Sequence, residues 1–499
     1  MNKVLKGLVA VAAAAAMAIA GFAGAASATA DTNYDITVPS SDTHTYSVYQ
    51  VFTGDLSNGT LSNIQPGQNF NSDNTNHKSA ADAAAEIAQG TYADDTARLA
   101  AIAPYVDLTG SAFGEVSANT ALHAPAGYYL LKDKAAVTGD DAATLFIVQV
   151  NGPVTVNRKA DKPTFEKKVK DVNDSTGVKT DWQDSADYDV NDEVPFQLTA
   201  TLPTNEADFA AYETYKLVFH DQQSAGLTFK PETVVVKYEG MTLNTESYAL
   251  DQNPTDDRTF DITITDAKTV KDANGNAITV AAGGKFTVEY KSELNASAVI
   301  GAAGNPNEAF LEFSNNPNVG GKGDTGETPT DKVIVFTYQL DINKTFTGGT
   351  PSDTDLPKFK LYKLDSTTND YTIDLGEVTI TKTEGGKYTA SFKRVDDGKY
   401  KLVETHTPAG FNTAADTTFE ITAGHDVLSD NPTLTSLKIN QTDGDKTNGT
   451  VQADVVNVKG SNLPSTGGMG TTILYAAGAA IVLVAAFGIA FAVRRRNAR

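Results

Sequence analysis

The sequence predicts an all-β body, on the evidence of short alternating segments, frequent turn residues and little helical patterning. Runs such as VPFQLTATLP (194–203), TFDITITD (259–266) and KFTVEYKSEL (285–294) alternate apolar and polar residues, which is typical of half-buried strands. Gly, Asn and Asp separate these runs and favour tight turns. The clearest helical pattern is SAADAAAEIAQ (79–89). Many short strands of this kind favour tandem immunoglobulin-like β-sandwich domains.

The N-terminus has the three parts of a secretory signal peptide. Lys3 and Lys6 precede an apolar run at 8–20, and the small residues AASATA follow it. This order predicts cleavage after Ala30 or Ala28. Residues 1–30 are therefore expected to be removed when the mature chain is exported.

An uncharged apolar segment near the C-terminus, 472–493, precedes three arginines at 494–496. About 22 residues at 1.5 Å each reach ~30 Å, so the segment is expected to cross a bilayer as a transmembrane helix. The arginines favour the cytoplasmic side for its end, which leaves the body of the chain outside the cell.

Charge and cysteine content narrow the possible functions. The 499 residues include 62 acidic and 40 basic side chains, and the net charge of -22 argues against binding to nucleic acid. The chain contains no cysteine, although disulfides are available to exported proteins. Any covalent crosslink must therefore use other side chains.

Two changes in composition divide the body into three domains. NRKADKPTFEKKV (157–169) is charged and contains proline, and NNPNVGGKGDTGETPTDK (315–332) is rich in Gly, Pro and Asn. The expected parts are an N-terminal domain at 31–160, a middle domain at 161–330, a C-terminal domain at 331–461 and a C-terminal segment at 462–499.

Strand parity directs one lysine, one acid and one asparagine towards the core in each of the last two domains. Side chains two positions apart share a face of a strand, so a polar residue in step with apolar neighbours points inward. These residues are Lys167, Asp221 and Asn315 in the middle domain and Lys344, Glu404 and Asn457 in the C-terminal domain. A slip of one residue reverses each assignment, so Lys168 and Asn316 are alternatives.

The two sets suggest a specific reaction. Burial favours a neutral amine and a protonated carboxyl group, because it penalises both charged forms. The amine can attack the asparagine carboxamide, while the acid polarises it and shuttles protons as ammonia leaves. We therefore predict a Lys–Asn isopeptide bond in each domain, with Asp221 or Glu404 as the acid. The reaction needs no cofactor, and the six histidines have no metal-ligand spacing, so no metal is expected.

The pentapeptide LPSTG precedes the expected membrane span. Pentapeptide, span and basic tail together resemble the cell-wall sorting signal of Gram-positive surface proteins. The resemblance implies that a sortase cleaves after Thr466 and passes the Thr466 carbonyl group to an amine. The residues of the motif are Leu463, Pro464, Ser465, Thr466 and Gly467.

Three segments of the body resemble motifs of Gram-positive fimbrial shaft subunits, whose Cna-type domains form isopeptide bonds. They are FHDQQSAGLTF (219–229), LEFSNNP (311–317) and YKLVETHTPAGF (400–411). The resemblance assigns the acid role to Asp221 and Glu404 and the asparagine role to Asn315, in agreement with strand parity.

The segment VTVNRK (154–159) resembles the pilin motif of these shaft subunits, in which Tyr-Pro-Lys follows a strand. Asn157 and Arg158 stand in the places of Tyr and Pro. Parity turns Lys159 towards solvent, and Lys162 is an alternative. The resemblance implies that a pilin-specific sortase joins Thr466 of one subunit to Lys159 of the next.

These features together predict an extracellular major pilin and no enzyme with an external substrate. Its expected partners are the pilin-polymerising and housekeeping sortases, identical subunits, minor pilins, peptidoglycan and host surface ligands. The alternatives are a monomeric wall-anchored adhesin and a minor pilin at the tip or base.

Overall fold

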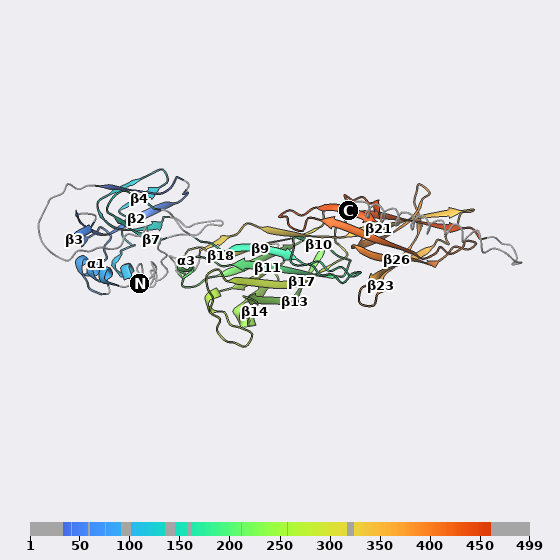
Figure 1. Cartoon of the computed structure of the whole chain (residues 1–499), viewed down its shortest axis with the longest axis horizontal. Coiled ribbons are helices and arrows are strands. Elements are labelled where there is room, and N and C mark those ends of the chain that lie inside the picture. Colours follow the sequence, from blue (N-terminus) through green and yellow to red (C-terminus); the bar gives the residue numbers. More distant parts are fainter. Residues whose placement is uncertain are drawn as a thin grey trace, which may run out of the picture.

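The computed structural model describes residues 33–460, except for 41, 58–59, 75, 91–100, 135–144, 157–160, 211, 257 and 317–323. Three β-rich domains follow one another along an elongated molecule (Figure 1). The predicted all-β architecture of tandem sandwich domains is confirmed. The expected signal peptide, LPSTG motif and membrane span lie outside the described residues, among which no helix is long and apolar enough to cross a membrane.

The described residues of the N-terminal domain form two sheets and include the helix α1. The sheet orders are β5-β1-β8 and β3-β2-β6-β7, with β4 beside β2. The helix α1 (Ala80–Gln89) confirms the helical pattern of the sequence, and the Ser79 side chain caps it by accepting a hydrogen bond from the Asp82 N–H. The strands are β1 (Tyr34–Thr37), β2 (Thr45–Ser57), β3 (Thr60–Pro66), β4 (Gly114–Ser117), β5 (Leu122–Ala124), β6 (Gly127–Asp133), β7 (Leu145–Val150) and β8 (Val154–Thr155).

The middle domain is a sandwich of two larger sheets, β14-β13-β17-β11-β9 and β10-β20-β18-β12-β16-β15, with β19 beside β18. Alternate residues of β11 and β17 are buried, as the sequence pattern predicted. The strands of the first sheet are β9 (Thr164–Val169), β11 (Glu193–Thr201), β13 (Leu227–Tyr238), β14 (Met241–Thr242) and β17 (Lys285–Leu294). Those of the second are β10 (Ser185–Asp187), β12 (Leu217–Gln223), β15 (Ala249–Asp251), β16 (Phe260–Ile264), β18 (Asn305–Ser314), β19 (Thr325–Glu327) and β20 (Asp331–Phe336). A short helix, α3 (Glu206–Ala210), follows β11.

The C-terminal domain has the sheets β24-β25-β21-β30 and β23-β22-β26-β27-β28-β29. Its first and last strands, β21 and β30, are parallel neighbours. The strands are β21 (Tyr338–Thr347), β22 (Lys358–Asp365), β23 (Asp370–Thr379), β24 (Thr381–Lys382), β25 (Tyr388–Val395), β26 (Gly398–His406), β27 (Thr417–His425), β28 (Leu434–Ile439), β29 (Thr442–Asp443) and β30 (Thr450–Val458).

Strand β20 joins the middle and C-terminal domains. It pairs with β18 and β10 of the middle domain, so our boundary at residue 330 is corrected to the end of β20 at Phe336. Val333 and Val335 pack into the middle-domain core, whereas Ile334 and Phe336 pack into the C-terminal core. The composition break at 315–332 lies within the middle domain, because β19 and β20 both pair with β18 of that domain.

A buried lysine also connects the two domains. Lys363, on β22 of the C-terminal domain, is fully buried, and its Nζ lies 2.7 Å from Asp189 Oδ2 and 3.1 Å from Asp174 Oδ2 of the middle domain. The third carboxylate, Asp396 Oδ1, lies 2.6 Å away. The backbone N–H of Asp396 also donates a hydrogen bond to Asp189 Oδ1, at 2.9 Å. The joint therefore combines apolar packing with a buried ionic cluster.

Candidate isopeptide-forming sites

In the middle domain the predicted lysine and acid meet inside the sandwich. Lys167 lies on β9 of one sheet and Asp221 on β12 of the other, and both side chains are fully buried. Lys167 Nζ donates a hydrogen bond to Asp221 Oδ2 at 2.5 Å. The alternative lysine, Lys168, is turned away from this pair and binds Asp184 at 2.5 Å. Of the two lysines, the one that parity selected is the one that lies beside the buried acid.

The hydroxyl group of Tyr290, on β17, connects this pair to a further asparagine. It donates to Asp221 Oδ2 at 2.6 Å and accepts hydrogen bonds from Lys167 Nζ at 2.9 Å and Asn307 Nδ2 at 3.0 Å. Both Tyr290 and Asn307 are buried. The carboxamide oxygen of Asn307 is buried without a hydrogen-bond partner among the described residues.

The structure does not bring Asn315 to this site. Asp221 pairs with Ala309 on β18, and Asn315 lies six residues farther along the chain. At ~3.4 Å per residue the separation is about 20 Å. The alternative Asn316 is also remote and donates to Asp324 Oδ2 at 2.6 Å. The prediction of Asn315 is therefore corrected to Asn307.

The error has a simple physical origin. Asn307 lies on the buried face of β18, and Asn315, directly after the end of that strand, continues the same alternation and is also buried. Parity specifies a face of a strand but not a level along it. The level depends on the pairing of β18 with β12, where Asn307 stands opposite Gln223.

In the C-terminal domain the three predicted residues come together. Asn457 Nδ2 donates to Glu404 Oε2 at 3.0 Å, and the Ala414 N–H donates to the same oxygen at 2.5 Å. Lys344 pairs with Val455 across the parallel strands β21 and β30, two residues before Asn457, and its Nζ contacts the Val455 carbonyl oxygen at 3.4 Å. Lys344, Glu404 and Asn457 are all buried.

Burial shifts both lysines towards the neutral amine. It lowers the pKa of Lys167, and the negative charge of Asp221 opposes this effect. It lowers the pKa of Lys344 to about 8, against the opposing attraction of Glu404. With a pKa of about 8, roughly one Lys344 amine in ten is neutral at pH 7, compared with fewer than about one in a thousand for an ordinary lysine.

Unsatisfied oxygens mark where the acid would act. Asn457 Oδ1 and Glu404 Oε1 are buried without hydrogen-bond partners among the described residues, as is Asn307 Oδ1. A buried acceptor without a donor is costly. A proton on the neighbouring carboxyl group would supply that donor and would polarise the carboxamide carbon for attack by the amine. Each site thus has a nucleophile, an electrophile and an acid.

The predicted polymerisation residues are described only in part. Lys159 and the motif at 463–467 lie outside the described residues. Lys162, the alternative acceptor, is exposed and lies two residues before β9, the first strand of the middle domain. The structure therefore shows that an exposed lysine exists near this boundary.

Two groups of side chains at the joint between the middle and C-terminal domains have a spacing that would suit a metal ion. One contains Asp171, Asp187 and His425, and the sequence spacing gave no sign of it because the three residues come from distant segments. The other contains Asp174, Asp189, Asp192 and Asp396. Lys363 contributes a positive charge to this second group. Neither group contains a member of the isopeptide-forming sites.

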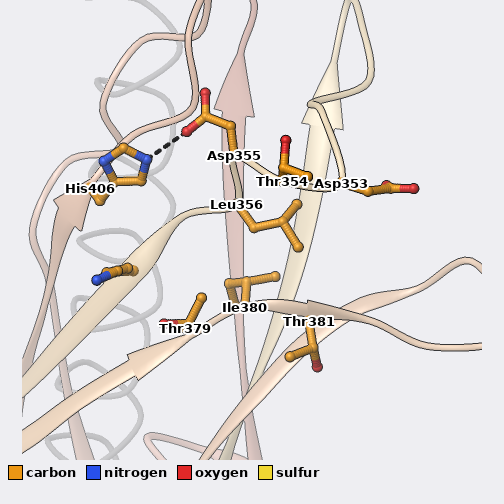
Figure 2. A pocket seen from close by; sticks show the side chains of 9 residues that line it. Asp353, Thr354, Asp355, Leu356, Thr379, Ile380, Thr381 and His406 are labelled. Carbon is orange, nitrogen blue, oxygen red and sulfur yellow. Dashed lines mark hydrogen bonds and ion pairs between the residues drawn. The ribbon is translucent and has the colours of Figure 1, made fainter.

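A pocket of about 490 Å³ lies on the C-terminal domain between the loop 353–356, the end of β23 and β26 (Figure 2). His406 and Asp355 form an ion pair at its wall, with Nε2 and Oδ1 2.7 Å apart, and Leu356 and Ile380 add apolar surface. No lysine–acid–asparagine set lines it. The pocket is thus separate from the sites described above.

Comparison with known proteins agrees with this architecture. Residues 356–432 match the family model of the SpaA prealbumin-like fold domain. The chain is 26% identical over 411 residues to the trypsin-resistant surface T6 protein of Streptococcus pyogenes serotype M6, covering 68% of this chain and 70% of that protein.

Solved structures give the same result for the fold. The T6 backbone pilin of serotype M6 Streptococcus pyogenes, described as a modular three-domain structure, aligns with a TM-score of 0.52 and 16% identity over 87% of this chain and all of that one. The full-length major pilin SpaD of Corynebacterium diphtheriae aligns with a TM-score of 0.46 and 18% identity, covering 86% of this chain and 98% of that one. The alignment with the T6 backbone pilin supports the fold that the sequence motifs indicated.

Proposed function

We propose that this chain is the major subunit of a covalent pilus on the surface of a Gram-positive bacterium, and that it crosslinks itself internally. The observation that carries this proposal is the pair of buried lysine–acid–asparagine sets, one in each of two successive sandwich domains. Burying a lysine and a carboxyl group is costly, and folding alone does not require two such buried sets.

The internal crosslinks join Lys167 to Asn307 and Lys344 to Asn457. Asp221 and Glu404 act as the acids. In each case the neutral amine attacks the carboxamide carbon, the carbon–nitrogen bond of the asparagine breaks, and ammonia leaves. The chain acts once on itself and has no external substrate.

Polymerisation uses residues at the two ends of the body. A pilin-specific sortase cleaves between Thr466 and Gly467 and transfers the Thr466 carbonyl group to the amine of Lys159 in the next subunit. A housekeeping sortase then attaches the finished polymer to peptidoglycan. Minor pilins complete the fibre, which carries adhesion to host surface ligands. The motif LPSTG, the apolar segment after it and the likeness to the T6 backbone pilin support this assembly.

An immunoblot of cell-wall extracts boiled in SDS tests the polymer. The wild type is expected to give a high-mass ladder, and Lys159→Ala is expected to collapse it to the monomer. Lys162→Ala is the matched control and should retain the ladder.

Other outcomes separate the alternatives. A ladder that survives Lys159→Ala and disappears with Lys162→Ala moves the acceptor to Lys162. A single monomer band from the wild type, in cells that contain the pilin sortase, would contradict the proposal and favour a wall-anchored adhesin.

A further inference from the structure

Tyr290 has a position in the middle-domain site that no residue has in the C-terminal site. Its hydroxyl group contacts the nucleophile Lys167, the acid Asp221 and the leaving nitrogen of Asn307 at 2.9, 2.6 and 3.0 Å. In the C-terminal domain Glu404 reaches Asn457 directly, at 3.0 Å. Among the described residues, Asp221 and Asn307 share no direct hydrogen bond and are connected through Tyr290.

The strands that hold the acid and the asparagine differ between the two sites. Asp221 and Asn307 lie on β12 and β18, neighbouring strands of one sheet, whereas Glu404 and Asn457 lie on β26 and β30 of opposite sheets. The second oxygen of Asp221 is held by Gln223, whose Nε2 donates to Oδ1 at 3.2 Å, and Gln223 is in turn held by Ser292 at 2.8 Å. Only Oδ2 therefore faces the reacting groups, and the phenol hydroxyl spans the remaining gap.

We propose that Tyr290 is a catalytic residue of the middle-domain crosslink and relays a proton from Asp221 to the departing nitrogen of Asn307. This inference rests on the Lys167–Asn307 crosslink proposed above. It assigns different proton paths to the two domains: through a phenol in the middle domain and directly from the carboxyl group in the C-terminal domain.

The step balances without any co-reactant. Lys167 Nζ forms a bond to Asn307 Cγ, the displaced electron pair moves to Oδ1, and the lone pair of Nδ2 is no longer delocalised once the carbon is tetrahedral. Tyr290 then donates its proton to Nδ2 and takes one from Asp221 Oδ2. The Cγ–Nδ2 bond breaks and ammonia leaves, while Asp221 recovers a proton from Nζ. Both the phenol and the carboxyl group end in the form in which they began.

The surroundings of Tyr290 suit a relay. Burial raises the pKa of Tyr290 well above its ordinary value, so the hydroxyl group remains protonated and available to donate. Three aromatic rings fix its orientation: Phe196 is stacked at 5.4 Å, and Phe260 and Phe229 contact it edge-on at 5.0 and 5.7 Å. The hydroxyl group is thus held in place by packing that does not depend on its hydrogen bonds.

The test measures crosslinking of the full chain in cells without sortase. After pulse labelling, the purified chain is digested, and the joined peptides Lys167–Asn307 and Lys344–Asn457 are quantified over time by mass spectrometry. Tyr290→Phe is expected to slow the first crosslink by roughly 100-fold, the usual effect of removing a proton-transfer group, and to leave the second unchanged. Tyr215→Phe, at a fully buried tyrosine of the same core outside the site, is the matched control and should leave both rates unchanged.

Fluorotyrosine at position 290 separates a relay from simple packing. It keeps the ring and the hydroxyl group but acidifies the phenol, so a relay predicts an altered rate and a packing role predicts the wild-type rate. This measurement decides the question if Tyr290→Phe fails to fold. A wild-type rate in either variant would overturn the role of Tyr290. Absence of the Lys167–Asn307 peptide from the wild type would instead overturn the crosslink itself.

Discussion

Replacing Asn307 should remove the middle-domain crosslink, whereas replacing Asn315 should leave it intact. Asn307 reaches Tyr290 at 3.0 Å, whereas Asn315 lies six residues past Ala309, the partner of Asp221, which is about 20 Å at the ~3.4 Å rise of a strand. The two variants remove the same buried carboxamide, one from β18 and one from the residue directly after its end. Asn315→Ala is therefore the matched control for Asn307→Ala.

The expected loss of stability follows from the loop that the bond closes. Lys167 and Asn307 enclose well over a hundred residues, and by analogy with a disulfide a crosslink of this span restricts the unfolded chain by about 5 kcal/mol. A domain of this size shifts its melting temperature by about 2–4 °C per kcal/mol, so Asn307→Ala should lower the Tm of the middle domain by roughly 10–20 °C.

Intact mass and calorimetry of protein from cells without sortase provide the measurement. The wild type and Asn315→Ala should each be lighter than their sequences by two ammonia molecules, and Asn307→Ala by one. Retention of two losses in Asn307→Ala, or only one loss in Asn315→Ala, would refute the register argument. A mass change without the predicted fall in Tm would refute the estimated loss of stability.

Two further predictions concern the charged groups. Lys363→Met leaves Asp189 and Asp396 buried without their cation, which should destabilise the joint by about 3–5 kcal/mol at pH 7. Burial raises the pKa of both carboxyl groups, so on acidification they become protonated in the folded variant before they do so in the unfolded chain. The loss of stability should therefore be smaller at pH 5 than at pH 7 in denaturant titrations. Equal losses at both pH values would contradict this. In Asn457→Ala the unbonded Lys344 amine has a pKa of about 8, below that of the unfolded chain. The free energy of unfolding of Asn457→Ala should therefore rise, relative to the wild type, by up to ~1.4 kcal/mol per pH unit between about pH 8 and 10.5. The wild type should not show this rise, because its acylated Lys344 cannot titrate. Parallel pH profiles of the two proteins would count against the prediction.

Strand parity selected five of the six residues that we propose for the crosslinks, because burial on a strand is a local property. A lysine, an acid or an asparagine in step with apolar neighbours must point to the core. The sixth residue depended on the pairing of β18 with β12, which joins segments almost a hundred residues apart. Local alternation contains no information about that register, so Asn307 and Asn315 were equivalent in the sequence.

Two other features were hidden for different reasons. A tyrosine at an inward position of a strand, such as Tyr290, has the pattern of an ordinary core residue, and only its three hydrogen bonds distinguish it. The domain boundary was misplaced because a Gly-rich segment looks the same whether it separates domains or connects two strands of one sheet. Alternate residues of β20 pack into two different cores, and this can be seen only in the folded structure.

The positions of the two proposed bonds determine which parts of the body would bear a pulling force. The chain enters the C-terminal domain on β21 and leaves it on β30, and these parallel neighbours are joined by Lys344 and Asn457. Force would cross that bond directly and bypass most of the domain. In the middle domain it would pass from Lys167 to Asn307, which pairs with Val333 on β20.

The weakest part of this path therefore lies between the two bonds. From Asn307 to Lys344 the load is carried by the β18–β20 ladder and by the joint, without a covalent shortcut. This is also where β20 packs into two cores and where Lys363 connects three carboxylates across the domains. A strand shared by two cores and a buried ionic cluster thus occur at the segment that neither crosslink protects, and both would resist separation of the two domains there.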